Sequence, residues 1–190
     1  MQGGDKDRLI LAAFVAGEPG AAEAFVRAHE ASLYGFALRV LGDAAAAEDV
    51  VQETFLSAHQ HGPSFEARGS VRAWLFTIAR RACLRRRRLR VGEPSTLEPL
   101  DSLGAEAGWG SEDPESCFSR LQLREKLGAA LERLSPSDRE VIVLRDVEGL
   151  AGSEAAEVLG ITLRALKSRL HRARLRLAAA YRKETSNDGD

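Results

Sequence analysis

The chain has 190 residues, a formal net charge of −1 at pH 7 and 44% hydrophobic residues, which is enough for one domain or two small ones. Its two cysteines lie far apart in the sequence, so they form neither a disulfide framework nor a zinc-binding spacing. No segment has the pattern of a signal peptide or the length of a membrane span, so we expect a cytoplasmic protein without membrane contact of its own.

Charge is segregated along the chain, although the total is close to zero. Residues 80–90 carry only positive charges, residues 93–115 only negative ones, and residues 164–176 only positive ones. A protein with this pattern can bind a polyanion locally while its net charge stays near neutral.

The N-terminal half has apolar residues at helical spacing and few strand signals. Gly17 and Pro19 separate the first two helices, Gly42 and Asp43 separate the next two, and Ser70 caps the last. The predicted helices cover residues 5–16, 21–41, 44–60 and 70–90, with a loop at residues 61–69.

The third predicted helix is amphipathic. Val50, Val51 and Phe55 belong to its apolar face. The opposite face carries acidic and amide side chains, namely Glu48, Asp49, Gln52 and Glu53. On the residues alone, this face is either a solvated surface or a partner-binding one.

Residues 91–117 differ from the segments on either side. They are rich in Gly, Pro, Ser and Glu and show no apolar periodicity, which is typical of a linker. We therefore expect an all-α protein with one small helical domain at residues 1–90, a flexible acidic linker at 91–117, a second helical domain at 118–182 and a disordered tail at 183–190.

The second domain contains the pattern of a helix-turn-helix. Ser135 and Pro136 suit a helix start. Further on, a short helix ends at Gly160, which tolerates the left-handed turn, and Thr162 can cap the next helix. A small Ala156 lets the two helices cross closely.

The last predicted helix runs from Leu163 to about Ala180 and has two contrasting faces. The buried face is expected to hold Leu166, Leu170, Ala173, Leu175 and Leu177. The exposed face is expected to hold Arg164, Lys167, Ser168, His171, Arg172 and Arg174. A helix of this kind fits the DNA major groove, although basic surface helices without such a role are also common.

The two halves together resemble one family. Residues 41–43, 47–55 and 74–80 resemble domain 2 of the extracytoplasmic-function (ECF) sigma factors of the sigma-70 family. Residues 134–145 and 166–174 resemble domain 4 of the same family. Two motif sets in the right order, with a linker between them, are more specific than either set alone.

The resemblance implies a role for each region. It implies that the chain binds core RNA polymerase, through the β′ clamp helices and the β flap, binds promoter DNA and has an anti-sigma factor partner. Contact with the clamp helices would come from Asp49, Gln52 and Glu53. The −10 element would be held by Phe65, Arg80, Arg81, Arg85, Arg87 and Arg88. The −35 element would be read by Arg164, Lys167, Ser168, His171 and Arg172.

Several positions depart from the family pattern. Arg81 and Arg85 stand near places where the family usually has Asn and Asp, which bears on the −10 bases that are read. Arg164 adds a charge at the reading end of the last helix, so the −35 preference is expected to be unusual. Ser135 replaces a usual Pro and changes only the cap.

Two other classes of protein are alternatives to this family. A stand-alone helix-turn-helix repressor or activator would use the N-terminal half for dimerisation or sensing. An enzyme is not expected, because no phosphate-binding loop, nucleophile motif or HExxH pattern is present. His59 and His61 are only a weak metal signal, so we expect no metal or cofactor.

Overall fold

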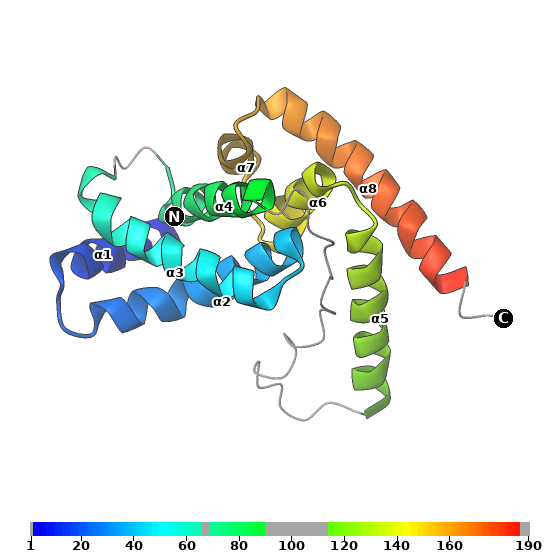
Figure 1. The fold of residues 1–190 in the computed structure, drawn as a ribbon, viewed down its shortest axis with the longest axis horizontal. Coiled ribbons are helices and arrows are strands. Elements are labelled where there is room, and N and C mark those ends of the chain that lie inside the picture. Colours follow the sequence, from blue (N-terminus) through cyan, green and yellow to red (C-terminus); the bar gives the residue numbers. More distant parts are fainter. Residues whose placement is uncertain (1, 66–68, 90–113, 187–190) are drawn as a thin grey trace.

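The computed structural model describes residues 2–65, 69–89 and 114–186, and every regular element in these ranges is a helix. Figure 1 shows two groups of helices lying against each other. The N-terminal domain holds α1 (Gln2–Ala16), α2 (Ala21–Leu41), α3 (Ala44–His61), the short 3-10 helix η1 (Gly62–Ser64) and α4 (Val71–Leu89). The C-terminal domain holds α5 (Pro114–Glu132), α6 (Pro136–Ile142), the π-helical segment η3 (Val143–Val147), α7 (Gly152–Leu159) and α8 (Leu163–Ser186). The prediction of two small all-α domains is confirmed.

Aromatic side chains form the centre of the N-terminal domain. Phe25 and Phe36 of α2 and Phe76 of α4 are fully buried. The rings of Phe36 and Phe76 meet edge to face with centroids 5.4 Å apart, a favourable geometry for aromatic pairs. Val50 of α3 is buried in the same core. The predicted apolar face of α3 is therefore what attaches this helix to its neighbours.

Local capping explains where α3 and α4 begin. The Asp43 carboxylate accepts a hydrogen bond of 2.7 Å from the backbone N–H of Ala46, and Gly42 before it has a φ of 68°. The Ser70 hydroxyl oxygen accepts a hydrogen bond of 3.1 Å from the backbone N–H of Ala73. Both predicted helix starts are confirmed, and the two helices pack side by side.

The C-terminal domain contains the predicted helix-turn-helix. Helix α7 ends at Gly160, whose φ is 67°, and the backbone N–H of Ile161 donates to the Ala156 carbonyl at 3.0 Å. The Thr162 hydroxyl then accepts from the backbone N–H of Ala165 at 3.2 Å and caps α8. This turn sets the direction in which α8 leaves the domain.

One linker boundary was predicted wrongly. Helix α5 begins at Pro114, so the last four residues of the predicted linker, 114–117, are helical. Proline is well suited to the first helical position, because its fixed φ matches the helix and its missing N–H would have no partner there. The rest of the predicted linker lies outside the described residues.

The start of the predicted tail also differs. Helix α8 continues to Ser186, past the expected end at 182. The Glu184 carboxylate lies 2.5 Å from the Arg133 guanidinium at the end of α5, and this ion pair ties the last turn of α8 to the domain. Residues 187–190 lie outside the described part of the chain.

His29 is a buried polar side chain in the N-terminal domain. Its Nε2 atom has no hydrogen-bond partner among the described residues, and its ring packs edge-on against Phe25 with centroids 4.9 Å apart. Burial lowers the pKa of His29, while the charge of Asp7 partly opposes that shift. The neutral imidazole is thus the form that the folded core accommodates.

We expect His29 to make the domain less stable in acid. In the unfolded chain a histidine takes up a proton near pH 6.5, whereas folded His29, with its lowered pKa, resists it. The unfolded state therefore binds more protons, and the free energy of unfolding should fall as pH drops below about 6.5, by at most about 1.4 kcal/mol per pH unit. Urea unfolding between about pH 8 and 5 measures this slope.

A His29→Leu variant should have a flatter profile than the wild type, whereas His61→Gln, which changes an exposed histidine, should not. Equal slopes for wild type and His29→Leu would contradict the assignment.

Candidate functional site

The exposed face of α8 is the first element of the site. All five residues predicted to read the −35 element are solvent-exposed on this helix, namely Arg164, Lys167, Ser168, His171 and Arg172. Leu166, Leu170 and Ala173 are buried on the other face, as predicted. The helix thus presents a row of donors outward while its apolar face anchors it to the domain.

One residue of α8 departs from the predicted division. Leu175 was expected to be buried but is 59% exposed, because at 3.6 residues per turn it lies on the side of α8 opposite Leu166, Leu170 and Ala173. Arg174 forms an ion pair of 2.5 Å with Asp146, and Arg176 pairs with Asp138 at the start of α6. These two arginines therefore connect α8 to its own domain.

Helix α4 divides its arginines between two faces. Arg81, Arg85 and Arg88 are exposed, and their spacing of four and three residues places them on one face. Arg80 and Arg87 lie on a different face and contact the C-terminal domain. The five arginines predicted to form one DNA surface are therefore not equivalent.

The acidic face of α3 is partly engaged by α4. The Glu53 carboxylate accepts hydrogen bonds from Arg85 and from Arg86, the latter at 2.6 Å. Burial by itself would raise the pKa of Glu53, but the hydrogen bonds from Arg86 and Arg85 outweigh it and lower the pKa. Asp49, by contrast, is 63% exposed and lies 3.5 Å from Arg86. Gln52 is also exposed.

Phe65 is half-buried at the end of η1. Its ring packs against Trp74 with centroids 4.9 Å apart, and both side chains lie against the domain core. Residues 66–68 of the predicted DNA-binding loop lie outside the described residues.

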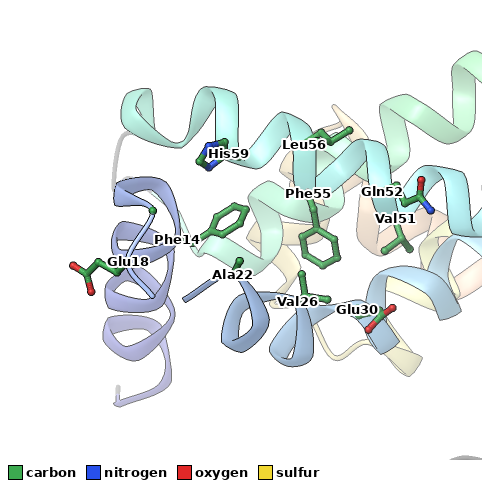
Figure 2. A pocket seen from close by; sticks show the side chains of 11 residues that line it. Phe14, Glu18, Ala22, Val26, Glu30, Val51, Gln52, Phe55, Leu56 and His59 are labelled. Carbon is green, nitrogen blue, oxygen red and sulfur yellow. The ribbon is translucent and has the colours of Figure 1, made fainter. Parts of the chain in front are cut away.

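An apolar groove lies between α1, α2 and α3, and Figure 2 shows the side chains that line it. Its volume is about 680 Å³. Its floor and walls include Phe14, Val26 and Phe55, and its rim carries Glu18 and Glu30. The groove extends to Gln52, Leu56 and His59 on α3. The sequence did not reveal this groove, because three separate helices contribute to it.

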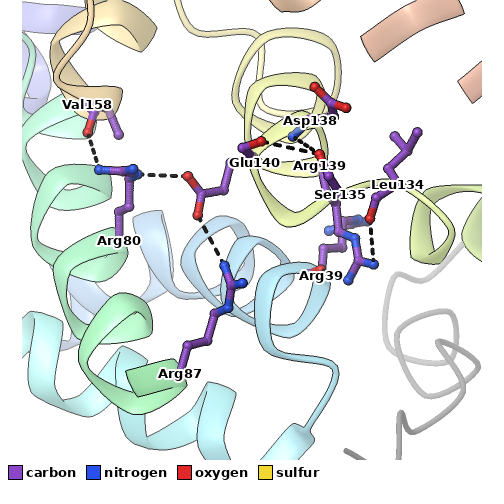
Figure 3. A network of polar contacts seen from close by, with 10 residues as sticks. Arg39, Arg80, Arg87, Leu134, Ser135, Asp138, Arg139, Glu140 and Val158 are labelled. Atoms are coloured by element: carbon purple, nitrogen blue, oxygen red, sulfur yellow. Dashed lines mark hydrogen bonds and ion pairs between the residues drawn. The ribbon is translucent and has the colours of Figure 1, made fainter. Parts of the chain in front are cut away.

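The buried contacts between the two domains were also not predicted from the sequence. Arg80 of α4 donates from Nε to the Glu140 carboxylate at 2.9 Å and from Nη1 to the Val158 carbonyl at 3.5 Å. Arg87 lies 3.9 Å from the other oxygen of Glu140. Figure 3 shows the two arginines on either side of this carboxylate.

The histidines and the described cysteine do not form a reactive site. Within the described ranges no group of three or more His, Cys, Asp or Glu side chains is arranged to hold a metal ion. His61 has its Nδ1 atom 2.9 Å from the Ser57 carbonyl, and the His59 ring lies edge-on to Phe14. Burial raises the pKa of the Cys83 thiol to about 12, which disfavours the reactive thiolate. No helix in the described residues has the length and apolar character needed to cross a membrane.

Comparison with known proteins places both halves of the chain in one family. The model of sigma-70 region 2 matches residues 25–91, and that of sigma-70 region 4 matches residues 124–177. The ECF RNA polymerase sigma factor SigL of Mycobacterium tuberculosis is 37% identical over 164 residues, which cover 84% of this chain and 90% of SigL. The ECF RNA polymerase sigma factor SigE of Mycolicibacterium smegmatis is 34% identical over 85% of this chain, although the match spans only 62% of SigE.

A solved structure agrees with this placement. The sigma factor RpoE, crystallised with the anti-sigma factor NepR from Bartonella quintana, superposes with a TM-score of 0.60 at 32% identity, covering 79% of this chain and 89% of that one. The chain therefore belongs to the ECF group of sigma-70 family sigma factors, which associate with RNA polymerase and direct transcription initiation.

Proposed function

We propose that the N-terminal domain of this chain binds core RNA polymerase, that α8 reads the −35 element of the promoter, and that α4 holds the −10 element. The observation that carries this proposal is the row of exposed polar and cationic side chains on α8, placed directly after a helix-turn-helix turn. The exposed arginines of α4 provide a second cationic surface on the other domain, which suits two separate promoter elements. In this role the protein is a non-enzymatic transcription factor that acts in the cytoplasm, where bacterial RNA polymerase works.

Contact with the β′ clamp helices is assigned to the exposed part of the α3 face. Asp49 and Gln52 are accessible to a partner, whereas the Glu53 carboxylate is already occupied by two arginines of α4. We therefore assign direct polymerase contact to Asp49 and Gln52, and to Glu53 the task of holding α4 against α3. The β flap is the second polymerase element in this proposal and would be met by the C-terminal domain.

Run-off transcription with purified core polymerase on a set of promoters tests the function. Discrete transcripts should require both core enzyme and this chain. A chain that binds specific duplex DNA tightly without polymerase, and that supports no transcript, would instead be a stand-alone repressor or activator. That alternative is not favoured, because both sigma-70 family models match the chain.

A double charge change on α3 should weaken polymerase binding without unfolding the domain. Asp49→Arg combined with Gln52→Arg places two cations where a basic partner helix would bind, and both side chains are exposed. We expect association with core to weaken by roughly 2 kcal/mol or more, about thirtyfold. Co-elution with core polymerase in gel filtration measures the loss.

Glu23→Arg, an exposed charge reversal on α2, is the matched control and should co-elute normally. If the folded double variant also co-elutes normally, α3 is not the polymerase-binding face.

An anti-sigma factor is the second protein partner that we propose. The groove between α1, α2 and α3 suits one amphipathic helix, because its walls are apolar and Glu18 and Glu30 on its rim would attract basic residues. Gln52 belongs both to this groove and to the proposed polymerase contact. An anti-sigma helix bound in the groove would therefore compete with core polymerase.

A further inference from the structure

Helix α1 contacts the start of the loop at residues 61–69, which joins α3 to α4. It packs on the domain core through Leu11, which is 3% exposed, and through Phe14, whose ring stacks on Phe25 with centroids 4.6 Å apart. The residues of α1 precede residues 25–91, the part of the chain that the sigma-70 region 2 model matches. The role of α1 is therefore not given by that match.

One end of the loop touches α1 through Gly62. The φ and ψ of Gly62 are −55° and −37°, which any residue adopts, so its backbone conformation does not require a glycine. Its surroundings do, because a Cβ built on Gly62 would overlap the Cγ2 methyl of Val15. Valine is branched at Cβ and has little freedom to turn this methyl away. The absence of a side chain at position 62 thus lets α1 pack directly on the loop.

The other end of the loop is joined to α1 by Arg8. Its Nη2 atom donates to the Gly69 carbonyl at 3.4 Å, and the next residue, Ser70, caps α4. Arg8, Leu11 and Val15 are spaced by three and four residues, so they share one face of α1. Arg8 and Val15 are about 10 Å apart along the helix axis, at 1.5 Å per residue. A single helix thus holds both ends of the loop at a fixed separation.

The position of Phe65 depends on that of Gly62. The Phe65 N–H donates to the Gly62 carbonyl at 3.0 Å. The Ser64 hydroxyl donates to the His61 carbonyl at 2.8 Å, so η1 is a hydrogen-bonded turn that moves as a unit. The Phe65 ring packs on Trp74 of α4. A displacement of Gly62 would therefore move Phe65 away from its place on α4.

We propose that α1 is a positioning element for −10 recognition: Val15 against Gly62 and Arg8 at Gly69 fix the ends of the loop and hold Phe65 where an unpaired base of the −10 element can stack on it. This rests on the proposed function, because Phe65 belongs to the predicted −10 surface. A loop that is held in place beforehand loses less conformational freedom when a base stacks on its aromatic side chain. Helix α1 acts through Phe65 and does not itself touch DNA.

Gly62→Ala should weaken promoter opening, because the added methyl meets Val15 and pushes η1 away from α1. The reactivity of −10 thymines toward permanganate, in promoter complexes of core polymerase with the full chain, measures unpaired bases. We expect this reactivity to fall roughly tenfold, which corresponds to about 1.4 kcal/mol. Co-elution with core polymerase should be unchanged, because Asp49 and Gln52 lie on a part of α3 remote from Gly62.

Two double variants separate positioning from a general loss of structure. Gly62→Ala with Val15→Ala should recover most of the opening, because the Val15 Cβ lies 3.7 Å from the place of the new methyl, an ordinary packing distance. Gly62→Ala in a Phe65→Ala background should add no further loss, because the side chain that it displaces is already absent.

Arg8→Ala should lower the permanganate reactivity in the same direction as Gly62→Ala, by a smaller factor, because it releases only the second end of the loop. Its matched control is Arg27→Ala, at an exposed arginine of α2 that pairs with Glu23, and this variant should open promoters normally.

A folded Gly62→Ala variant that opens promoters as the wild type does would overturn the positioning proposal. So would a loss of equal size in the wild-type and Phe65→Ala backgrounds, because it would then not act through Phe65. If Gly62→Ala does not fold, as judged by circular dichroism, Arg8→Ala with Val15→Ala only removes atoms from α1 and is tested against the same two outcomes.

Failure of the proposed function has a different signature. Wild-type protein would then give no transcript with core polymerase, whatever the variants of α1 do. The −10 role of Phe65 is tested by Phe65→Ala alone, which should already lower the reactivity. Normal opening by that variant would refute the role of Phe65, and the positioning proposal with it.

Discussion

Replacing Arg81 and Arg88 with glutamine will weaken promoter complexes of the holoenzyme and flatten their dependence on salt. Both side chains are exposed on one face of α4, away from the contact with the C-terminal domain. Each phosphate contact that is lost lowers the slope of log affinity against log salt by about one unit, so the double variant should lose about two. Measuring complex formation with core polymerase present, at several salt concentrations, gives this slope.

The control is Arg27→Gln, which removes an exposed arginine of α2 that pairs with Glu23. It should leave the slope unchanged. If the double variant shows the wild-type slope, the exposed face of α4 is a solvated or protein-binding surface, and the −10 assignment of these residues is wrong.

The structure also changes which arginines should be tested. Sequence alone treats Arg80, Arg85, Arg87 and Arg88 as one basic run. Arg80 and Arg87 contact Glu140, and Arg85 contacts Glu53 on α3, so replacing them would disturb the fold or the domain contact as well as DNA binding. Arg81 and Arg88 give the cleaner experiment.

Helix positions could be predicted because their determinants are local in sequence. Asp43 caps α3 through the N–H three residues later, and Gly160 ends α7 through its own backbone conformation. The spacing of Leu166, Leu170 and Ala173 similarly fixes the buried face of α8 within that helix. These features depend on neighbours within about one helical turn.

Features that depend on distant neighbours could not be predicted. The partner of Arg80 is 60 residues away, in another domain, and no periodicity links the two positions. The apolar groove combines side chains from three helices. Tertiary packing decides each of these cases.

The last prediction separates sequence reading from structural support in α8. Arg172 is exposed on the outer face, and its Nε donates to the Ser168 carbonyl at 3.3 Å, so removing its side chain leaves the domain core intact. A base-reading side chain is worth roughly 1–3 kcal/mol and acts mainly on its own base pair. Arg172→Ala should therefore change the preference at one or two positions of the −35 element.

Leu166 and Arg176 should behave differently. Leu166 is 1% exposed, so Leu166→Ala should destabilise the C-terminal domain by roughly 2–5 kcal/mol, seen in urea unfolding. Arg176 pairs with Asp138 of α6, so Arg176→Ala should loosen the attachment of α8 and lower transcription evenly across promoters.

Transcription from a promoter library randomised across the −35 region distinguishes these roles. Replacing a base-reading residue changes which −35 sequences are preferred. Replacing a supporting residue lowers transcription from every sequence by a similar factor, because a loosened helix loses all its contacts alike. Arg172→Ala should shift the profile, and Arg176→Ala should only scale it. A profile for Arg172→Ala that is scaled but unshifted would assign this arginine to the phosphate backbone and leave the reading of bases to Arg164, Lys167, Ser168 and His171.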